Sequence, residues 1–240
     1  MKITVALFAV AGLAAAANAG VASVIASTSF ENGFVGNQYQ DTGDSSVDHD
    51  LFNNAGESAV DFTASGGEMG VDAYYRNTRG SNGLTDGDFV GFTNFTGTVG
   101  AFTDGIQGYQ MSDADGTMGI NFDTVNFAGT WGVTMDFYIT ETGWESDDSI
   151  RVWITGDAGT IDILNTIGSD IDDLLIEDSW LALSLDLSAY TNATLHVELE
   201  SNSGSEAIYI DNVVFSGIPT PGTAALLGLG GLVATRRRRA

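Results

Sequence analysis

The chain has 240 residues and a strongly acidic composition, with 32 aspartates and glutamates against eight lysines and arginines. Five of those basic residues lie in the two terminal segments, so the part between them has three arginines against 32 carboxylates, a formal charge of −29. Such a surface repels phosphate backbones and excludes nucleic acid as a partner. The chain has no cysteine, so a core without disulfides must stabilise it, and its ordinary apolar content argues against disorder.

The first 19 residues have the layout of a secretory signal peptide. Lys2 supplies a positive start, an apolar stretch covers 5–17, and Ala17 and Ala19 form a small-x-small cleavage site. We therefore expect export and cleavage after Ala19, which leaves one domain over 20–217. A buried N-terminal helix is the alternative, but the apolar stretch has no polar face to turn towards solvent.

Beyond this segment, apolar and polar residues alternate, which is the pattern of strands with one buried face. The clearest case is 131–139, where every odd position is apolar. Asn-Gly, Asp-Gly and Gly-Gly pairs between such stretches indicate tight turns. The pattern predicts an all-β fold, a sandwich of two antiparallel sheets with one short helical turn within 169–179. The ranges expected as strands are 24–30, 58–63, 69–76, 88–93, 118–127, 131–139, 149–155, 180–187, 195–200 and 207–215.

The two ends of the domain carry a family resemblance. Residues 27–33 read STSFENG, and residues 206–215 read EAIYIDNVVF. A first strand with Phe-Glu and a last strand with Ile-Asp-Asn-Val resemble the jelly-roll of several carbohydrate-binding module families and of MAM-type adhesion domains. The resemblance implies a jelly-roll whose first and last strands are neighbours, with a structural calcium ion held by Glu31 and Asp211. The alternative is that both carboxylates face solvent at strand ends.

Aromatic side chains beside polar groups are the candidates for sugar binding, because a flat apolar ring packs well against the face of a sugar. Trp153 lies between two β-branched apolar residues and so faces the opposite side of its strand, and Trp144 lies in an acidic loop. Tyr74 and Tyr75 form a second aromatic group. We expect these four residues to contribute to a site for extracellular polysaccharide. For each ring, packing into the core is the alternative.

Two further acidic stretches suggest cation binding. In SDADGTM, residues 112–118, Asp113 and Asp115 precede a glycine as in a calcium loop, but the third oxygen ligand and the later glutamate of that motif are missing. We interpret this stretch as an acidic turn. The loop 41–50 contains four aspartates and His49, and we interpret it as a solvated acidic loop.

Catalysis by paired carboxylates is the main alternative to binding, because a glycosidase needs two carboxyl groups across a cleft. Glu198 and Glu200 share one face of a predicted strand, and residues 144–148 offer Glu145, Asp147 and Asp148. Chance pairs are common among 32 acids, and there is no Gly-x-Ser-x-Gly motif. We expect a non-catalytic protein. A glycan hydrolase and a purely structural surface protein are the alternatives.

The last 23 residues have a different character from the domain. Pro219 and Pro221 are the only prolines, and the stretch 223–235 is almost uncharged. An apolar stretch beside an arginine cluster is typical of a membrane segment whose basic end stays in the cytoplasm. The cluster consists of Arg236, Arg237, Arg238 and Arg239.

This tail resembles the PEP-CTERM sorting signal, which has a short Pro-x-Pro motif, an apolar helix and a basic end; Thr220 stands where the family has a glutamate. The resemblance covers 218–240 and implies an apolar C-terminal helix, at least transient insertion in the inner membrane, and processing by an exosortase. It also implies delivery to the cell envelope or extracellular matrix. An uncleaved C-terminal anchor is the alternative, although the apolar stretch is short against the ~20 residues that span a bilayer.

Overall fold

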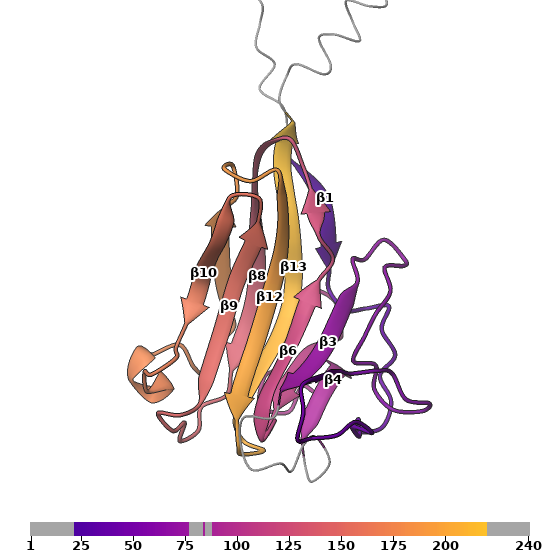
Figure 1. The fold of residues 1–240 in the computed structure, drawn as a ribbon, viewed down its shortest axis with the longest axis vertical. Coiled ribbons are helices and arrows are strands. Elements are labelled where there is room, and N and C mark those ends of the chain that lie inside the picture. The colour runs from indigo at the N-terminus through magenta and orange to yellow at the C-terminus, as the bar shows by residue number, and fades with distance from the viewer. Residues whose placement is uncertain (1–21, 77–83, 85–87, 220–240) are drawn as a thin grey trace, which may run out of the picture. The chain divides into compact units, whose positions relative to one another are not determined.

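In the computed structural model, residues 22–76, 84 and 88–219 are described, and their regular structure is almost entirely β-strand (Figure 1). Ala22–Pro219 forms one unit. The predicted signal peptide and the tail from Thr220 onward lie outside the described residues. Within the described part, no helix is long and apolar enough to cross a membrane.

One sheet, called here the first sheet, contains both ends of the domain. Its strand order is β11-β8-β13-β5-β4, and β1 pairs with the second half of β13. The pairing runs from Ser23 opposite Gly217 to Thr28 opposite Val213, so the first and last strands are neighbours as expected. The strands are β1 (Ser23–Thr28), β4 (Phe89–Thr93), β5 (Gly108–Ser112), β8 (Gly129–Ile139), β11 (Leu181–Asp186) and β13 (Ala207–Pro219).

The second sheet has the order β10-β9-β12-β6-β3-β2, and β7 also pairs with β12. Figure 1 shows β10, β9, β12, β6 and β3 side by side in this sheet. Every strand pair in both sheets is antiparallel, which confirms the predicted two-sheet sandwich. The strands are β2 (His49–Asp50), β3 (Val71–Arg76), β6 (Gly116–Phe122), β7 (Val125–Asn126), β9 (Ser149–Gly156), β10 (Gly159–Asn165) and β12 (Asn192–Ser201).

The alternating pattern decides which side chains enter the core. In β12, Leu195, Val197 and Leu199 are fully buried, and the residues between them face outward. Burying each such side chain stabilises the fold by about 1.5–3 kcal/mol. A second part of the core is aromatic: the rings of Phe30, Phe92 and Tyr109 lie with centroids 5.5–5.8 Å apart. The sheets therefore leave two outer faces available for function.

Three expectations about elements need correction. The predicted strand at 58–63 is wrong, because its backbone groups bond several different segments: Ser58 N–H donates to Asn37 O, and Ala59 O accepts from Phe92 N–H. The predicted strand 118–127 is two strands, β6 and β7. Strands β2, β5 and β10 were not predicted. The helical turn within 169–179 is present as the 3₁₀ helix η1 (Ile171–Leu174).

Candidate functional site

A hollow of about 470 Å³ lies on the second sheet, and five strands contribute to it. Its lining includes three of the four aromatic residues predicted to bind sugar: Tyr74 and Tyr75 from β3, and Trp153 from β9. It also contains polar residues that the sequence did not single out. Its lining residues are Asp48, His49, Asp50, Tyr74, Tyr75, Arg76, Asn121, Trp153 and His196.

One row of the hollow crosses three neighbouring strands. Trp153 lies directly opposite His196, and His196 lies opposite Asn121. The His196 ring stacks on Trp153, with centroids 4.9 Å apart and 14° between the planes. Both ring nitrogens are engaged, Nδ1 with Asn121 Oδ1 at 2.6 Å and Nε2 with Thr155 Oγ1 at 2.7 Å. Burial, and then the charge of Arg151, lowers the pKa of His196 to about 4, so the imidazole is neutral near pH 7.

The second row is built around Tyr74. Its hydroxyl donates to Glu198 Oε1 at 2.6 Å, and Arg76 Nη1 donates to the same oxygen at 2.9 Å. The Arg76 guanidinium lies 4.8 Å from the centre of the Tyr74 ring. Gly119 lies between Tyr74 and Glu198 in the sheet, and a Cβ there would come within 2.3 Å of the ring. A glycine at 119 therefore allows the tyrosine to cross β6 and reach the glutamate.

The described arginines both lie on this face. Arg151 repeats the arrangement of Arg76: its guanidinium lies 4.5 Å from the centre of the Trp153 ring, and its Nη2 donates to Asp162 Oδ1 at 2.8 Å. Trp153 and Tyr74 are each 9% exposed, because these neighbours cover them. The face combines fixed donors, fixed acceptors and partly covered rings. Such a set can hydrogen-bond a polyol in a defined orientation.

Two of the four predicted sugar-binding aromatics are in the core. Trp144 is 3% exposed, and its Nε1–H donates to Thr140 O at 3.0 Å. Tyr75 is fully buried, and its hydroxyl donates to Asp115 O at 3.2 Å. Because neighbouring residues of a strand face opposite sides, Tyr75 points inward where Tyr74 points outward. We assign both rings to the core, although Tyr75 also borders the hollow from beneath its surface.

The two carboxylates predicted to hold calcium reach one loop, residues 103–107. Glu31 Oε1 accepts from the backbone N–H groups of Ile106 and Gln107, both at 2.7 Å. Asp211 Oδ2 accepts from Asp104 N–H at 2.8 Å. Burial raises the pKa of Asp211 to about 6. These partners are donors, not oxygen ligands, so the carboxylates as described do not fit a calcium shell, which needs six or more oxygens.

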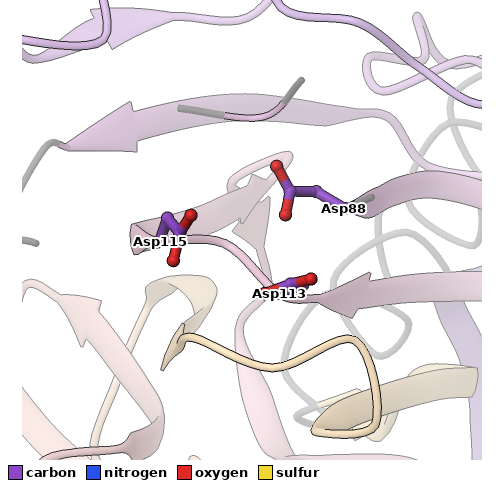
Figure 2. A group of neighbouring side chains, drawn as sticks. All are labelled: Asp88, Asp113 and Asp115. Atoms are coloured by element: carbon purple, nitrogen blue, oxygen red, sulfur yellow. The ribbon is translucent and has the colours of Figure 1, made fainter. Parts of the chain in front are cut away.

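Two groups of carboxylates have oxygen atoms within 4.8 Å of one another. The first combines Asp113 and Asp115, from the turn between β5 and β6, with Asp88, which precedes β4 (Figure 2). Asp113 and Asp115 have φ values of 53° and 47°, a turn conformation that aspartate tolerates. The sequence interpretation missed Asp88 because strand pairing brings it to the turn. The second group is Glu145, Asp148 and Glu206.

The structure shows partners for two of the carboxylates considered for catalysis, Glu198 and Asp148. Glu198 and Glu200 lie on one face of one strand, and Glu198 is engaged by Tyr74 and Arg76. Asp148 is fully buried and accepts from Glu145 N–H at 2.7 Å.

No family model matches the chain, and no curated protein shows a significant match. Solved structures with a similar fold include the Clostridium thermocellum N-terminal endo-1,4-β-D-xylanase 10B complexed with xylohexaose, at 13% identity and a TM-score of 0.35. The match covers 53% of this chain and only 24% of that one. The CBM22-1 xylan-binding domain from Paenibacillus barcinonensis matches over 85% of this chain and 99% of that one, at 14% identity and a TM-score of 0.35. Matches this distant establish neither a family nor a ligand.

The fold and the surface together define the class of protein, an all-β sandwich with a hollow on one sheet. The described part is an all-β sandwich of two antiparallel sheets. One sheet presents a hollow in which stacked aromatic, guanidinium, imidazole and amide groups are held by cross-strand contacts.

Proposed function

We propose that this protein binds a polysaccharide, without catalysis, on the outer face of the second sheet. The observation that carries the proposal is the pair of cross-strand rows, Trp153–His196–Asn121 and Tyr74–Glu198 with Arg76. Binding sites for small polar ligands combine apolar rings with a few fixed polar groups, and the rows supply both. The planar guanidinium of Arg76 keeps further donors available, since its side chain is 48% exposed.

The charges of the two rows support a neutral sugar chain, not an anionic one, as the ligand. His196 is neutral, and each described arginine has a carboxylate partner. The face therefore offers hydrogen bonds without a large excess of positive charge, which suits neutral sugar hydroxyls better than a polyanion. Xylan, named for the bacterial domain compared above, is a suitable first polysaccharide to test.

The test is binding of the purified protein to a panel of neutral polysaccharides by affinity electrophoresis and calorimetry. Trp153→Ala and Arg76→Ala should each weaken binding, Arg76→Ala by roughly threefold to tenfold. Phe34→Ala is the matched control, because Phe34 is 58% exposed and lies outside the hollow. Binding that survives both hollow variants would contradict the proposal.

Two alternatives predict different results in the same assay. A glycan hydrolase would release reducing ends from one of the polysaccharides, and replacing Glu198 by Gln would abolish that release. A purely structural surface protein would bind none of the panel. A far-UV circular dichroism spectrum of each variant separates loss of binding from loss of fold.

We further propose that the domain is exported through the signal peptide at 1–19 and sorted by the tail at 218–240. The support is the sequence layout: an apolar N-terminus ending at Ala19, and Pro219, Thr220 and Pro221 before an apolar stretch and four arginines. Intact mass of the protein recovered from cells tests this. A mature species that begins at Gly20 and lacks the basic end is expected, and a retained arginine cluster would contradict processing by an exosortase.

The resemblance to carbohydrate-binding modules and MAM-type domains suggests two further features, which we also propose: the jelly-roll order of the strands and a bound calcium ion. Pairing of β1 with β13 supports the former. For calcium, the support is that Glu31 and Asp211 reach the same loop, although both are bonded to N–H groups there.

A further inference from the structure

A second hollow, of about 600 Å³, lies on the first sheet. Part of its lining is a row of side chains directly opposite one another, Tyr138 on β8, Tyr209 on β13 and Gln110 on β5. We propose that this hollow is a second carbohydrate site, and that it takes a sugar unit carrying a free amine. The inference rests on the proposed carbohydrate-binding function but on none of the residues of the first hollow.

The aromatic part of the second hollow has an open ring. Phe95, from the segment after β4, lies nearly parallel to Tyr209, with ring centroids 6.3 Å apart and 23° between the planes. Tyr209 is 3% exposed, whereas Phe95 is 48% exposed. An exposed ring packed on a buried one is held in place by its neighbour and can pack against the C–H face of a sugar.

The Tyr209 hydroxyl offers a hydrogen-bonding group to a ligand in the second hollow. The Tyr209 side chain is 3% exposed, and its hydroxyl has no hydrogen-bond partner among the described residues, but this oxygen is not one of the polar atoms buried away from solvent. By contrast, the neighbouring Tyr138 hydroxyl donates to Asp178 Oδ1 at 2.7 Å. The hydroxyl is therefore free to bond whatever enters the hollow, either water or a ligand. A ligand hydroxyl in the hollow would complete the bonding of Tyr209.

The charges around the second hollow indicate what else the ligand carries. Asp178 and Glu141 line it, and among the described residues that line it none is lysine, arginine or histidine. The first hollow, in contrast, includes Arg76. Carboxylates without a nearby cation disfavour an anionic sugar and favour an ammonium group, and the charge of the domain adds long-range attraction for a cationic chain. An amino sugar satisfies both the ring and the carboxylates.

The experiment titrates the purified protein with oligomers of glucosamine, which carry free amines, at about 0.15 M salt to screen surface charge. The fully N-acetylated oligomers of the same length provide the comparison. We expect the free-amine oligomer to bind more tightly. Phe95→Ala should weaken it roughly threefold to tenfold, and Tyr209→Phe, which keeps the ring, should weaken it by a similar or smaller factor. Trp153→Ala and Phe34→Ala are expected to leave it unchanged.

Three results would overturn the inference. Equal affinity for free-amine and acetylated oligomers would remove the role of the carboxylates. Binding that is insensitive to Phe95→Ala and Tyr209→Phe would show that the overall charge of the domain, not the hollow, attracts the oligomer. Equally tight binding of oligolysine that does not depend on Phe95 would show the same. Because Trp153→Ala should weaken binding of neutral polysaccharide but not of the amino sugar, the two sites can fail separately.

Discussion

Glu31 and Asp211, from the first and last parts of the domain, are bound by the same loop of five residues. Glu31 accepts two backbone N–H groups at its end, residues 106 and 107, and Asp211 accepts Asp104 N–H and the Thr103 hydroxyl at its start. Asp211 lies where the register of β13 shifts, between Asp211 and Val214. The loop therefore connects the first and last parts of the domain.

This relationship predicts a large cost for Asp211→Asn. Asp211 is fully buried, and both of its oxygens accept N–H groups, Oδ1 from Asn212 and Oδ2 from Asp104. An amide would turn one acceptor into a donor facing another donor, which should cost about 2–4 kcal/mol in the free energy of unfolding. Urea unfolding measures it. Asp173→Asn, on an exposed residue of η1, is the control and should change stability by less than about 0.5 kcal/mol.

Calcium at Glu31 and Asp211 stays a prediction that thermal unfolding can test. An ion that binds only the folded protein raises the melting temperature as its concentration rises. If the two carboxylates hold calcium, excess calcium raises the wild-type midpoint, EDTA lowers it, and Asp211→Asn removes both effects. A midpoint that neither reagent moves would contradict the calcium site and leave the N–H contacts as the whole connection.

Gly119→Ala should reduce the affinity for polysaccharide. The new Cβ would collide with the end of the Tyr74 ring, which must swing outward at a cost of about 1–3 kcal/mol. Swinging out would break the bond from Tyr74 to Glu198 and disturb Arg76. Calorimetry against the bound polysaccharide should show weaker affinity. Gly143→Ala is the control, because a Cβ there meets no atom within 4 Å; equal affinities for the two variants would contradict the role of Tyr74.

The pH dependence of stability should include a contribution from Glu206. Burial, and then the charge of Asp148, raises the pKa of Glu206 from 4.5 to about 7. The folded state therefore holds a proton that the unfolded state releases, so this contribution is fully present below about pH 4.5 and is lost as pH rises through 7. Its size is at most about 3 kcal/mol.

Glu206→Gln isolates that contribution. The amide stays neutral, so the variant should lose less stability than wild type between pH 5 and about 7.5 in urea titrations. Other groups remain in both proteins: the raised pKa of Asp61, about 6, acts in the same direction, and the lowered pKa of His196 reduces stability as pH falls below 6.5. Glu141→Gln, at an exposed position, is the control. Parallel pH profiles for wild type and Glu206→Gln would refute the assignment.

The sequence was informative where one face of a strand is buried and the other is open. In β8, β9 and β12 this alternation predicted both the strands and the outward direction of Trp153. It was uninformative for β5, whose five residues are all buried because Phe102 and other residues after β4 cover the outer face as well. The strand predicted at 58–63 had the right pattern but no single partner strand.

The aromatic residues of the candidate site could be predicted from the sequence, but their partners on other strands could not. Composition drew attention to Tyr74 and Trp153, but their partners His196, Asn121 and Glu198 are set by which strands are neighbours and in what register. These are relationships between distant parts of the chain, and a single sequence does not state them. The opposite directions of Tyr74 and Tyr75, in contrast, follow from the two-residue period of any strand.

The most direct measurement of the central claim is an NMR titration of the four tryptophan indole N–H signals with a neutral oligosaccharide such as xylohexaose. Three indoles donate inside the protein, Trp131 to Tyr190 O, Trp144 to Thr140 O and Trp180 to Val99 O. Trp153 lines the proposed site. We predict that the Trp153 signal shifts in a saturable way while the Trp131 and Trp144 signals do not. Saturable binding that leaves the Trp153 signal unmoved would contradict a polysaccharide site on this face.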